Sequence, residues 1–123
     1  MLLLTLACAS APPDLAPTAV TTDAGLYALE LLATPSPFVA GEVAELSVRV
    51  SHADSPTGDA TVSLSPFMPD MGHGLSEDPP VEDRGEGEYF STWTFPMSGL
   101  WELEIGIDGA FGEDAATVSY VVD

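Results

Sequence analysis

Lysine is absent from the 123-residue chain and arginine occurs only twice, against 20 aspartates and glutamates, so the formal net charge is −18. Proteins that bind nucleic acid use Lys and Arg to displace counterions from phosphates, and peripheral membrane proteins use them for anionic lipid headgroups. The composition therefore argues strongly against both function classes. Because 46% of the residues are hydrophobic, the chain can nevertheless form a core, and we expect one soluble, cation-attracting domain.

Cysteine occurs once, at Cys8, so no internal disulfide can form. The apolar run MLLLTLA at residues 1–7 precedes it and is too short to span a bilayer. A run of this kind that ends in a small residue and a cysteine resembles the lipobox of bacterial lipoproteins, although Thr5 stands where leucine is usual. The resemblance implies a signal over residues 1–8, lipidation of Cys8 and an extracytoplasmic, lipid-anchored protein at the periplasmic face or cell surface of a bacterial membrane. The alternative is a free buried cysteine.

Large apolar side chains are scarce in the segment that follows. Eleven of residues 9–23 are Ala, Pro, Ser or Thr, and such a segment buries too little surface to offset its ordering entropy. Its three prolines favour an extended conformation. We therefore predict a disordered tether over residues 9–24 and a folded domain over residues 25–123.

No segment of that domain shows a sustained helical period, and its apolar residues instead alternate with polar ones, as in half-buried strands. Pro66 is predicted to end the third strand, and residues 67–80 form a long connection. Short strands separated by turns predict an all-β fold, an immunoglobulin-like antiparallel sandwich of about seven strands. The predicted strands cover residues 27–31, 44–50, 60–64, 81–83, 89–95, 101–107 and 116–122.

If every strand reverses direction, the connection at residues 67–80 and the turn at residues 96–99 emerge from the same end of the sandwich. His52 then lies at the opposite end. This arrangement requires the weak strand at residues 81–83.

The most informative segment is PFMPDMGHG, residues 66–74, which contains Met68, Met71 and His73. Thioether sulfur is a soft ligand and imidazole a borderline one, a combination that suits Cu(I) and not magnesium or calcium. Met97 would add a third sulfur if the two connections share one end. The alternative is structural: methionine fills irregular gaps in cores, and a histidine in a Gly-rich loop is commonly a surface residue.

The PFMPDMGHG segment, Gly87-x-Tyr89 and Phe95-x-Met97-x-Gly99-x-Trp101 together resemble the YtkA-like domain family, which is related to the FixH proteins. The similarity covers roughly residues 26–122. Family members are small exported or membrane-anchored immunoglobulin-like domains, and FixH-type members are linked to assembly of copper-containing respiratory oxidases. The resemblance implies an extracytoplasmic accessory domain that handles copper.

Signatures of catalysis are missing from the sequence: there is no G-x-S-x-G motif, no phosphate loop with a lysine and no calcium loop of the EF-hand type. We expect no catalytic residues, and an accessory or chaperone protein instead of an enzyme. Its expected partner is a copper ion or a copper-handling envelope protein. The second hypothesis is a protein-interaction module of the cell envelope that binds no metal.

Overall fold

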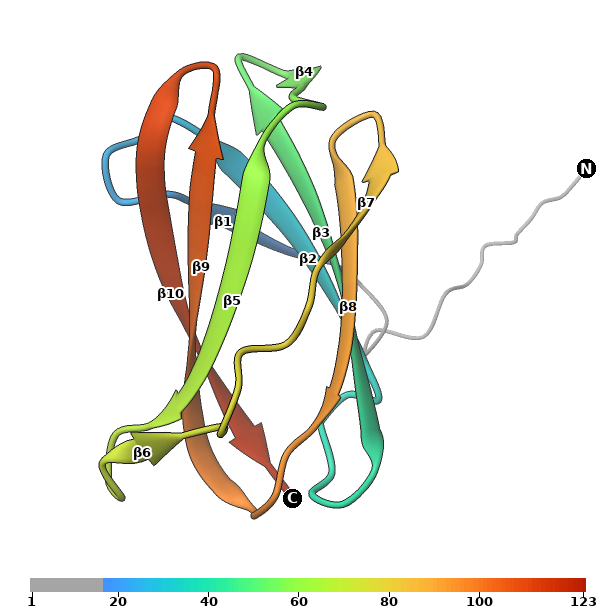
Figure 1. Cartoon of the computed structure of the whole chain (residues 1–123), viewed down its shortest axis with the longest axis vertical. Coiled ribbons are helices and arrows are strands. Elements are labelled where there is room, and N and C mark those ends of the chain that lie inside the picture. Colours follow the sequence, from blue (N-terminus) through green and yellow to red (C-terminus); the bar gives the residue numbers. More distant parts are fainter. Residues whose placement is uncertain (1–16) are drawn as a thin grey trace, which may run out of the picture.

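The computed structural model describes residues 17–123, which form two antiparallel sheets packed face to face (Figure 1). The first sheet has the order β1-β2-β3-β8-β7, with β4 paired to β3, and the second has the order β10-β9-β5-β6. Between residues 17 and 123 no helix is long and apolar enough to cross a membrane. The all-β sandwich is thus confirmed. Its strands are β1 Thr18–Thr21, β2 Ala28–Thr34, β3 Val43–His52, β4 Ser55–Pro56, β5 Thr61–Met68, β6 His73–Gly74, β7 Glu82–Gly85, β8 Glu88–Thr94, β9 Gly99–Gly109 and β10 Gly112–Val122.

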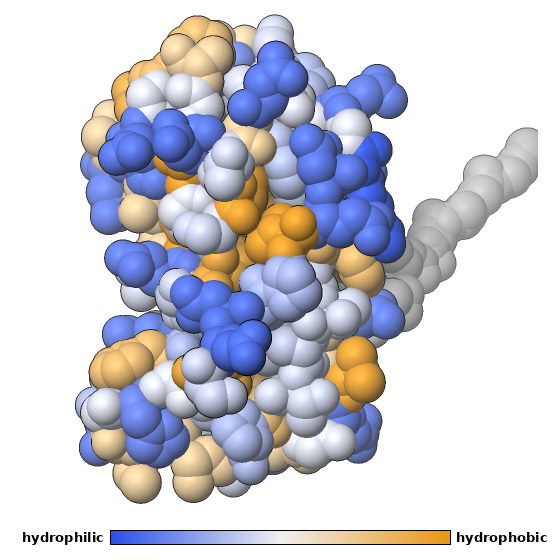
Figure 2. Space-filling model, viewed as in Figure 1, coloured by the Kyte–Doolittle hydropathy of each residue, from blue (hydrophilic) through white to orange (hydrophobic). Residues whose placement is uncertain are grey.

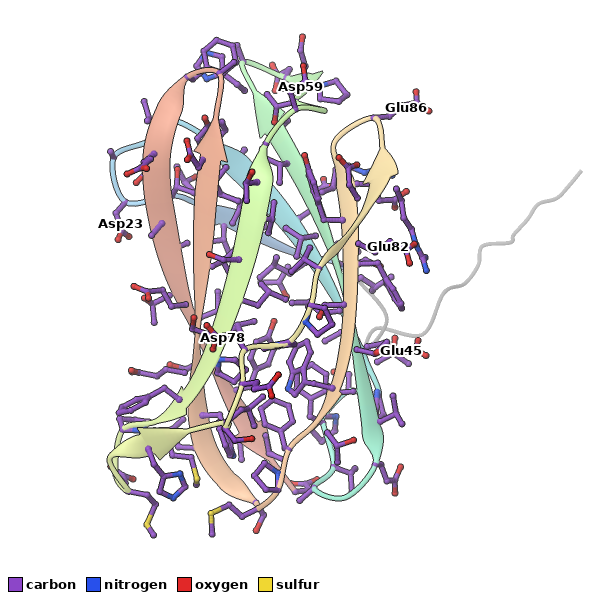
Figure 3. All side chains as sticks on the ribbon, in the orientation of Figure 1. Asp23, Glu45, Asp59, Asp78, Glu82 and Glu86 are labelled. Carbon is purple, nitrogen blue, oxygen red and sulfur yellow. The ribbon has the colours of Figure 1, made fainter. Side chains whose placement is uncertain are left out.

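The alternation in the sequence corresponds to the burial of side chains. In β3, Leu46 and Val50 are fully buried while Glu45 and Arg49, the residues directly before them, are exposed, because successive side chains of a strand point to opposite faces. Each of the seven predicted strands has a counterpart among the long strands or β7. Acidic side chains such as Glu82 and Glu86 extend away from the ribbon (Figure 3). Figure 2 shows hydrophilic residues over much of one face, with strongly apolar residues exposed near its middle and further apolar residues at its upper and lower ends.

The prediction for the tether was wrong at its C-terminal end, because β1 pairs with β2 inside the segment predicted to be disordered. Val20 lies opposite Leu29 and is half-buried. Composition alone missed this, since the backbone groups on the open edge of β2 stabilise any short extended segment that reaches them. Thr and Val also favour strands. The predicted signal, Cys8 and the rest of the tether up to residue 16 lie outside the described residues.

The predicted end of the third strand at Pro66 was also wrong. β5 continues through Pro66, which lies opposite Leu103 of β9, and ends at Met68. Over residues 61–66 β5 is the edge of its sheet, because β6 pairs only with Phe67 and Met68. Proline is tolerated on an edge strand, where a missing N–H need not break the ladder.

The turn between β1 and β2 is held to the start of β10 by the carboxylate of Asp114. This carboxylate accepts hydrogen bonds from the backbone N–H groups of Ala24 at 3.0 Å, Leu26 at 3.2 Å and Ala115 at 2.9 Å. Desolvation raises the pKa of Asp114, but the hydrogen bonds from these groups and the Thr22 side chain outweigh it and lower the pKa to about 2. Asp114 therefore acts as a structural anion.

Aromatic rings fill the end of the sandwich at which β8 meets β9. Phe95 packs edge-to-face on Trp101 with ring centroids 4.9 Å apart, and Phe38 contacts both Phe95 and Tyr120. Trp93 completes the cluster, and the indole N–H of this buried residue has no hydrogen-bond partner. The indole N–H of Trp101 connects this aromatic cluster to the Met97 carbonyl oxygen.

Candidate metal site

The segment that contains Met68, Met71 and His73 forms the β5–β6 hairpin. Met68 lies directly opposite His73, and the turn between them is closed by hydrogen bonds from the N–H groups of Met71 at 3.2 Å and Gly72 at 2.9 Å to the carbonyl oxygen of Met68. Residues directly opposite each other in an antiparallel pair have their side chains on the same face of the sheet. The thioether of Met68 and the imidazole of His73 are therefore neighbours on one face.

Gly74 makes this close pairing possible. A Cβ atom at position 74 would lie 2.5 Å from the carbonyl oxygen of Pro66, which is closer than real Cβ atoms approach other heavy atoms. Any residue other than glycine would separate β6 from β5. The sequence H-G is thus matched to a hairpin whose two strands approach closely.

Met97 reaches the same end from a segment nearly thirty residues further along the chain, the turn between β8 and β9. A Cβ atom at Gly99 would lie 3.0 Å from Cε of Met68, and φ of Gly99 is +129°, a conformation that favours glycine. The end of the Met68 side chain therefore lies against the start of β9, two residues from Met97. The indole N–H of Trp101 donates to the Met97 carbonyl oxygen at 3.0 Å and fixes the turn.

The predicted arrangement of the loops is thus confirmed. In the described chain, sulfur atoms occur only at the end of the sandwich where β6 and the β8–β9 turn lie (Figure 3). His52 is at the opposite end, where its ring stacks on Phe111 of the β9–β10 turn with centroids 3.6 Å apart, and its Nδ1 lies 2.7 Å from the Leu26 carbonyl oxygen. His52 therefore has a packing role that the sequence did not indicate.

Exposure separates the methionines into two kinds. Met68 is 5% exposed and packs into the core, so the gap-filling role applies to it. Met71 is 56% exposed and Met97 is 38% exposed, and neither fills a gap in the core. His73 is also exposed. Three of the candidate ligands can thus move toward a metal ion without disturbing the core.

The donor set is soft. Among residues 17–123, no group of three or more His, Cys, Asp and Glu side chains is arranged to hold a metal ion. Zinc or magnesium sites built from such groups are therefore not indicated in the described chain. Three thioethers and one imidazole instead match the ligand preference of Cu(I).

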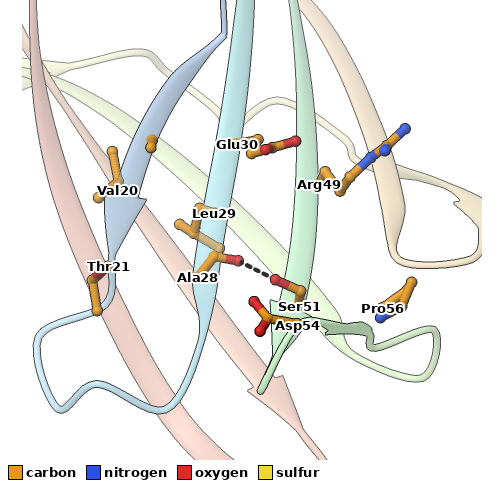
Figure 4. A pocket seen from close by; sticks show the side chains of 10 residues that line it. Val20, Thr21, Ala28, Leu29, Glu30, Arg49, Ser51, Asp54 and Pro56 are labelled. Atoms are coloured by element: carbon orange, nitrogen blue, oxygen red, sulfur yellow. Dashed lines mark hydrogen bonds between the residues drawn. The ribbon is translucent and has the colours of Figure 1, made fainter.

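A surface hollow of about 450 Å³ lies elsewhere, on the outer face of the first sheet (Figure 4). Its floor includes Ala28 and Ser51, whose hydroxyl lies 3.4 Å from the Ala28 carbonyl oxygen, and its charged residues are Glu30, Arg49 and Asp54. Arg49 also forms an exposed ion pair with Glu88. No motif in the sequence pointed to this hollow, because its lining comes from four strands and the β3–β4 turn instead of one continuous segment.

Comparison with known proteins identifies the family. The sequence profile described as YtkA-like matches residues 21–106. The chain belongs to the YtkA-like family. The matched range contains Met68, Met71, His73 and Met97, and it begins a few residues before the range that the motifs indicated. The family assignment rests on this sequence match and does not depend on whether the chain binds a metal.

A solved structure similar to this YtkA-like domain is that of a DUF4785 family protein from Legionella pneumophila. The TM-score is 0.64 at 11% sequence identity, and the match covers 79% of this chain but only 29% of the Legionella protein. This likeness shows the fold alone. Comparison with curated protein sequences finds no match.

Proposed function

We propose that this YtkA-like domain is a lipid-anchored, extracytoplasmic accessory protein that binds Cu(I) as cargo through Met68, Met71, His73 and Met97. The ion is held for transfer to a copper-handling envelope protein, and the domain itself is not an enzyme. The thioethers and the imidazole supply the donor atoms. The hydrogen bond from Trp101 of the aromatic cluster to the Met97 carbonyl oxygen holds the β8–β9 turn in place.

The observation that carries the proposal is the meeting of two distant segments at one end of the sandwich. Met68 and His73 are cross-strand neighbours in the β5–β6 hairpin, and Gly99 brings the β8–β9 turn onto the end of Met68. All methionines of the described chain are thereby placed at the end that contains His73. Two of them, Met71 and Met97, are exposed, so an ion can reach their sulfur atoms from the solvent.

The surrounding charge favours capture of a cation. Asp70 lies in the hairpin turn, Glu77 and Asp78 follow it, and all three are exposed. Carboxylates are hard ligands and do not select Cu(I), but they raise the local concentration of any cation. We therefore assign selectivity for Cu(I) to the sulfur and imidazole ligands, and fast capture of the ion to the carboxylates. Added salt screens the carboxylates, so it should lower the association rate of Cu(I) more than it lowers the affinity.

The test is an anaerobic titration of the purified protein with Cu(I) in competition with a chromogenic Cu(I) chelator. We expect one ion per chain. Replacing Met68 and Met71 by leucine and His73 by alanine should lower the affinity at least about tenfold, because losing ligands costs at least as much as losing the outer-shell partners that orient them. Because Leu and Met have similar volumes, the fold should survive, and a thermal melt checks this.

A matched control is His52→Gln, which changes the other histidine at the opposite end. It should leave the Cu(I) affinity unchanged. Equal affinity of the wild type and the triple variant, with both folded, would show that the site is wrong. A Met97→Leu variant then decides whether the β8–β9 turn contributes a ligand.

The anchor is tested separately at Cys8. Cells that express the full-length protein are labelled with an alkyne analogue of palmitate, and the wild type should incorporate the label and sediment with membranes. The Cys8→Ala variant should do neither. A wild-type protein that carries no label in the bacterial host would overturn the anchor and leave the copper site unaffected.

A further inference from the structure

β10 is a long strand at the edge of its sheet. It pairs with β9 over Gly112–Val122 without a bulge and has no strand on its other side in the described chain. Both ends of this free edge are covered by loops. The N–H of Asp23 donates to the carbonyl oxygen of Ala115, and Asp123 exchanges hydrogen bonds with Phe38 and Ala40.

These loop contacts reveal which backbone groups face outward. In an antiparallel ladder, alternate residues direct their N–H and C=O groups to the same side. Ala115 and Asp123 form these hydrogen bonds on the side of β10 that points away from β9. The backbone groups of Thr117, Ser119 and Val121 therefore also point away from β9, toward the free edge of the sheet. Among residues 17–123, no backbone hydrogen bond outside the ladders reaches these three residues. The window between the two loops therefore presents unpaired donors and acceptors in strand geometry.

Two other edges, those of β7 and β5, carry the usual protection against strand addition, and the remaining edge strand, β1, has only four residues. β7 has four residues, contains a register shift, and carries Glu82, Asp83 and Arg84. β5 has Pro66 on its edge, and the connection after β6 binds it through a hydrogen bond from the Ser65 hydroxyl to Asp78. Residues 115–122 of β10, in contrast, contain no charged residue, proline or glycine in a protein of net charge −18.

Along this window, hydrophobic side chains on one face of the sheet alternate with small polar side chains on the other. On the inner face, Val118 and Tyr120 are only partly buried against the core. On the outer face, Thr117 and Ser119 are small and lie opposite Glu104 and Glu102 of β9. A strand added to β10 would lie about 4.8 Å from it and roughly 9.6 Å from β9. Long cationic side chains on that strand can reach both carboxylates across the small residues.

We propose that the β10 edge between Thr117 and Val121 binds an extended segment of a partner protein by strand addition. The segment alternates β-branched residues, which cover Val118 and Tyr120, with Lys or Arg, which pair with Glu102 and Glu104. Charge complementarity selects this occupant over a second copy of the chain, because two copies would bring together net charges of −18 each. The proposal does not depend on the copper site.

The test uses the full-length protein and a fluorescent peptide in which Lys and Val alternate. We expect saturable binding by fluorescence anisotropy, with slower amide hydrogen exchange at Thr117, Ser119 and Val121. A peptide of the same sequence with alternate N-methylated residues keeps the charge but cannot pair with the edge, and it should bind at least about tenfold more weakly. Equal binding of the two peptides would overturn the proposal, because attraction to an acidic surface would then explain both.

Variants of the protein give a second, independent arm. Ser119→Pro removes an outward N–H without removing a bond to β9, so it should abolish peptide binding while the fold survives, and Ser119→Ala is the matched control that should bind normally. If the proline variant does not fold, Glu102→Gln with Glu104→Gln takes its place and should weaken binding several-fold. Unchanged binding in whichever variant is used would overturn the proposal. So would a wild-type dimer, detected by light scattering, that excludes the peptide, because the occupant would then be a second copy.

Discussion

Replacing Gly74 by alanine tests whether the β5–β6 hairpin positions His73. The new Cβ would lie 2.5 Å from the carbonyl oxygen of Pro66, whereas real Cβ atoms essentially never come within 3.0 Å of such an atom. Pro66 cannot easily yield, because it is buried in β5 and paired with Leu103. The strain must therefore be relieved on the side of β6.

The cost can be bounded in two ways. Overpacking of this kind costs about 1–3 kcal/mol when the structure stays closed. Releasing β6 instead loses the pairing of two residues with β5, and each backbone hydrogen bond contributes a net of about 0.5–1.5 kcal/mol. Since the protein adopts whichever response costs less, we expect a loss of about 1–2 kcal/mol in the free energy of unfolding, or roughly 5–15 °C in Tm for a domain of this size.

The assay is a thermal melt by circular dichroism, together with amide hydrogen exchange at His73 and the Cu(I) competition titration. The Gly74→Ala variant should melt earlier, exchange faster at His73 and bind Cu(I) more weakly. Gly58→Ala is the matched control, because its Cβ would have no neighbour closer than 3.9 Å and its φ is ordinary. A Gly74→Ala protein with wild-type stability and wild-type exchange at His73 would refute the argument that β6 is held this closely.

Two further predictions concern buried and charged groups away from the hairpin. The pKa of Asp114 falls from 3.8 to about 2 in the folded state, so this carboxylate stabilises the fold above pH 4 and loses that effect as the pH falls toward 2. The difference in Tm between wild type and Asp114→Asn should therefore shrink over that range, and a difference that stays constant would contradict the argument. Trp93→Phe removes an indole N–H that has no partner, whereas Trp101→Phe removes one that donates to the Met97 carbonyl oxygen. In urea unfolding, the free energy of unfolding of the Trp101 variant should therefore fall by about 1–3 kcal/mol more than that of the Trp93 variant. Equal losses would mean that the two indoles have equivalent hydrogen bonding.

The architecture could be predicted from the sequence because one physical rule dominates it. A residue such as Leu46 faces the core and its neighbour Glu45 faces solvent, and this period of two repeats along each long strand. Counting strand reversals was then enough to place Met97 at the same end as His73. The family likewise followed from residues in the hairpin and the β8–β9 turn, and the match over residues 21–106 confirms it.

Features decided by tertiary contacts could not be predicted. β1 exists because β2 offers an open edge, and nothing in the Ala- and Thr-rich segment itself requires a strand. The close approach of Gly74 to Pro66 and the stacking of His52 on Phe111 join residues whose proximity no local pattern encodes. The free edge of β10 is of the same kind, since an edge strand is defined by the neighbour that it lacks.

The measurement that tests the account most directly is the anaerobic Cu(I) titration of the wild type beside the variant with Met68→Leu, Met71→Leu and His73→Ala. The account predicts one tightly bound Cu(I) in the wild type and at least about tenfold weaker binding in the variant, with the fold of both intact. A wild-type protein that binds no Cu(I), or a folded variant that binds it equally well, would contradict the claim that this end of the sandwich is a copper site.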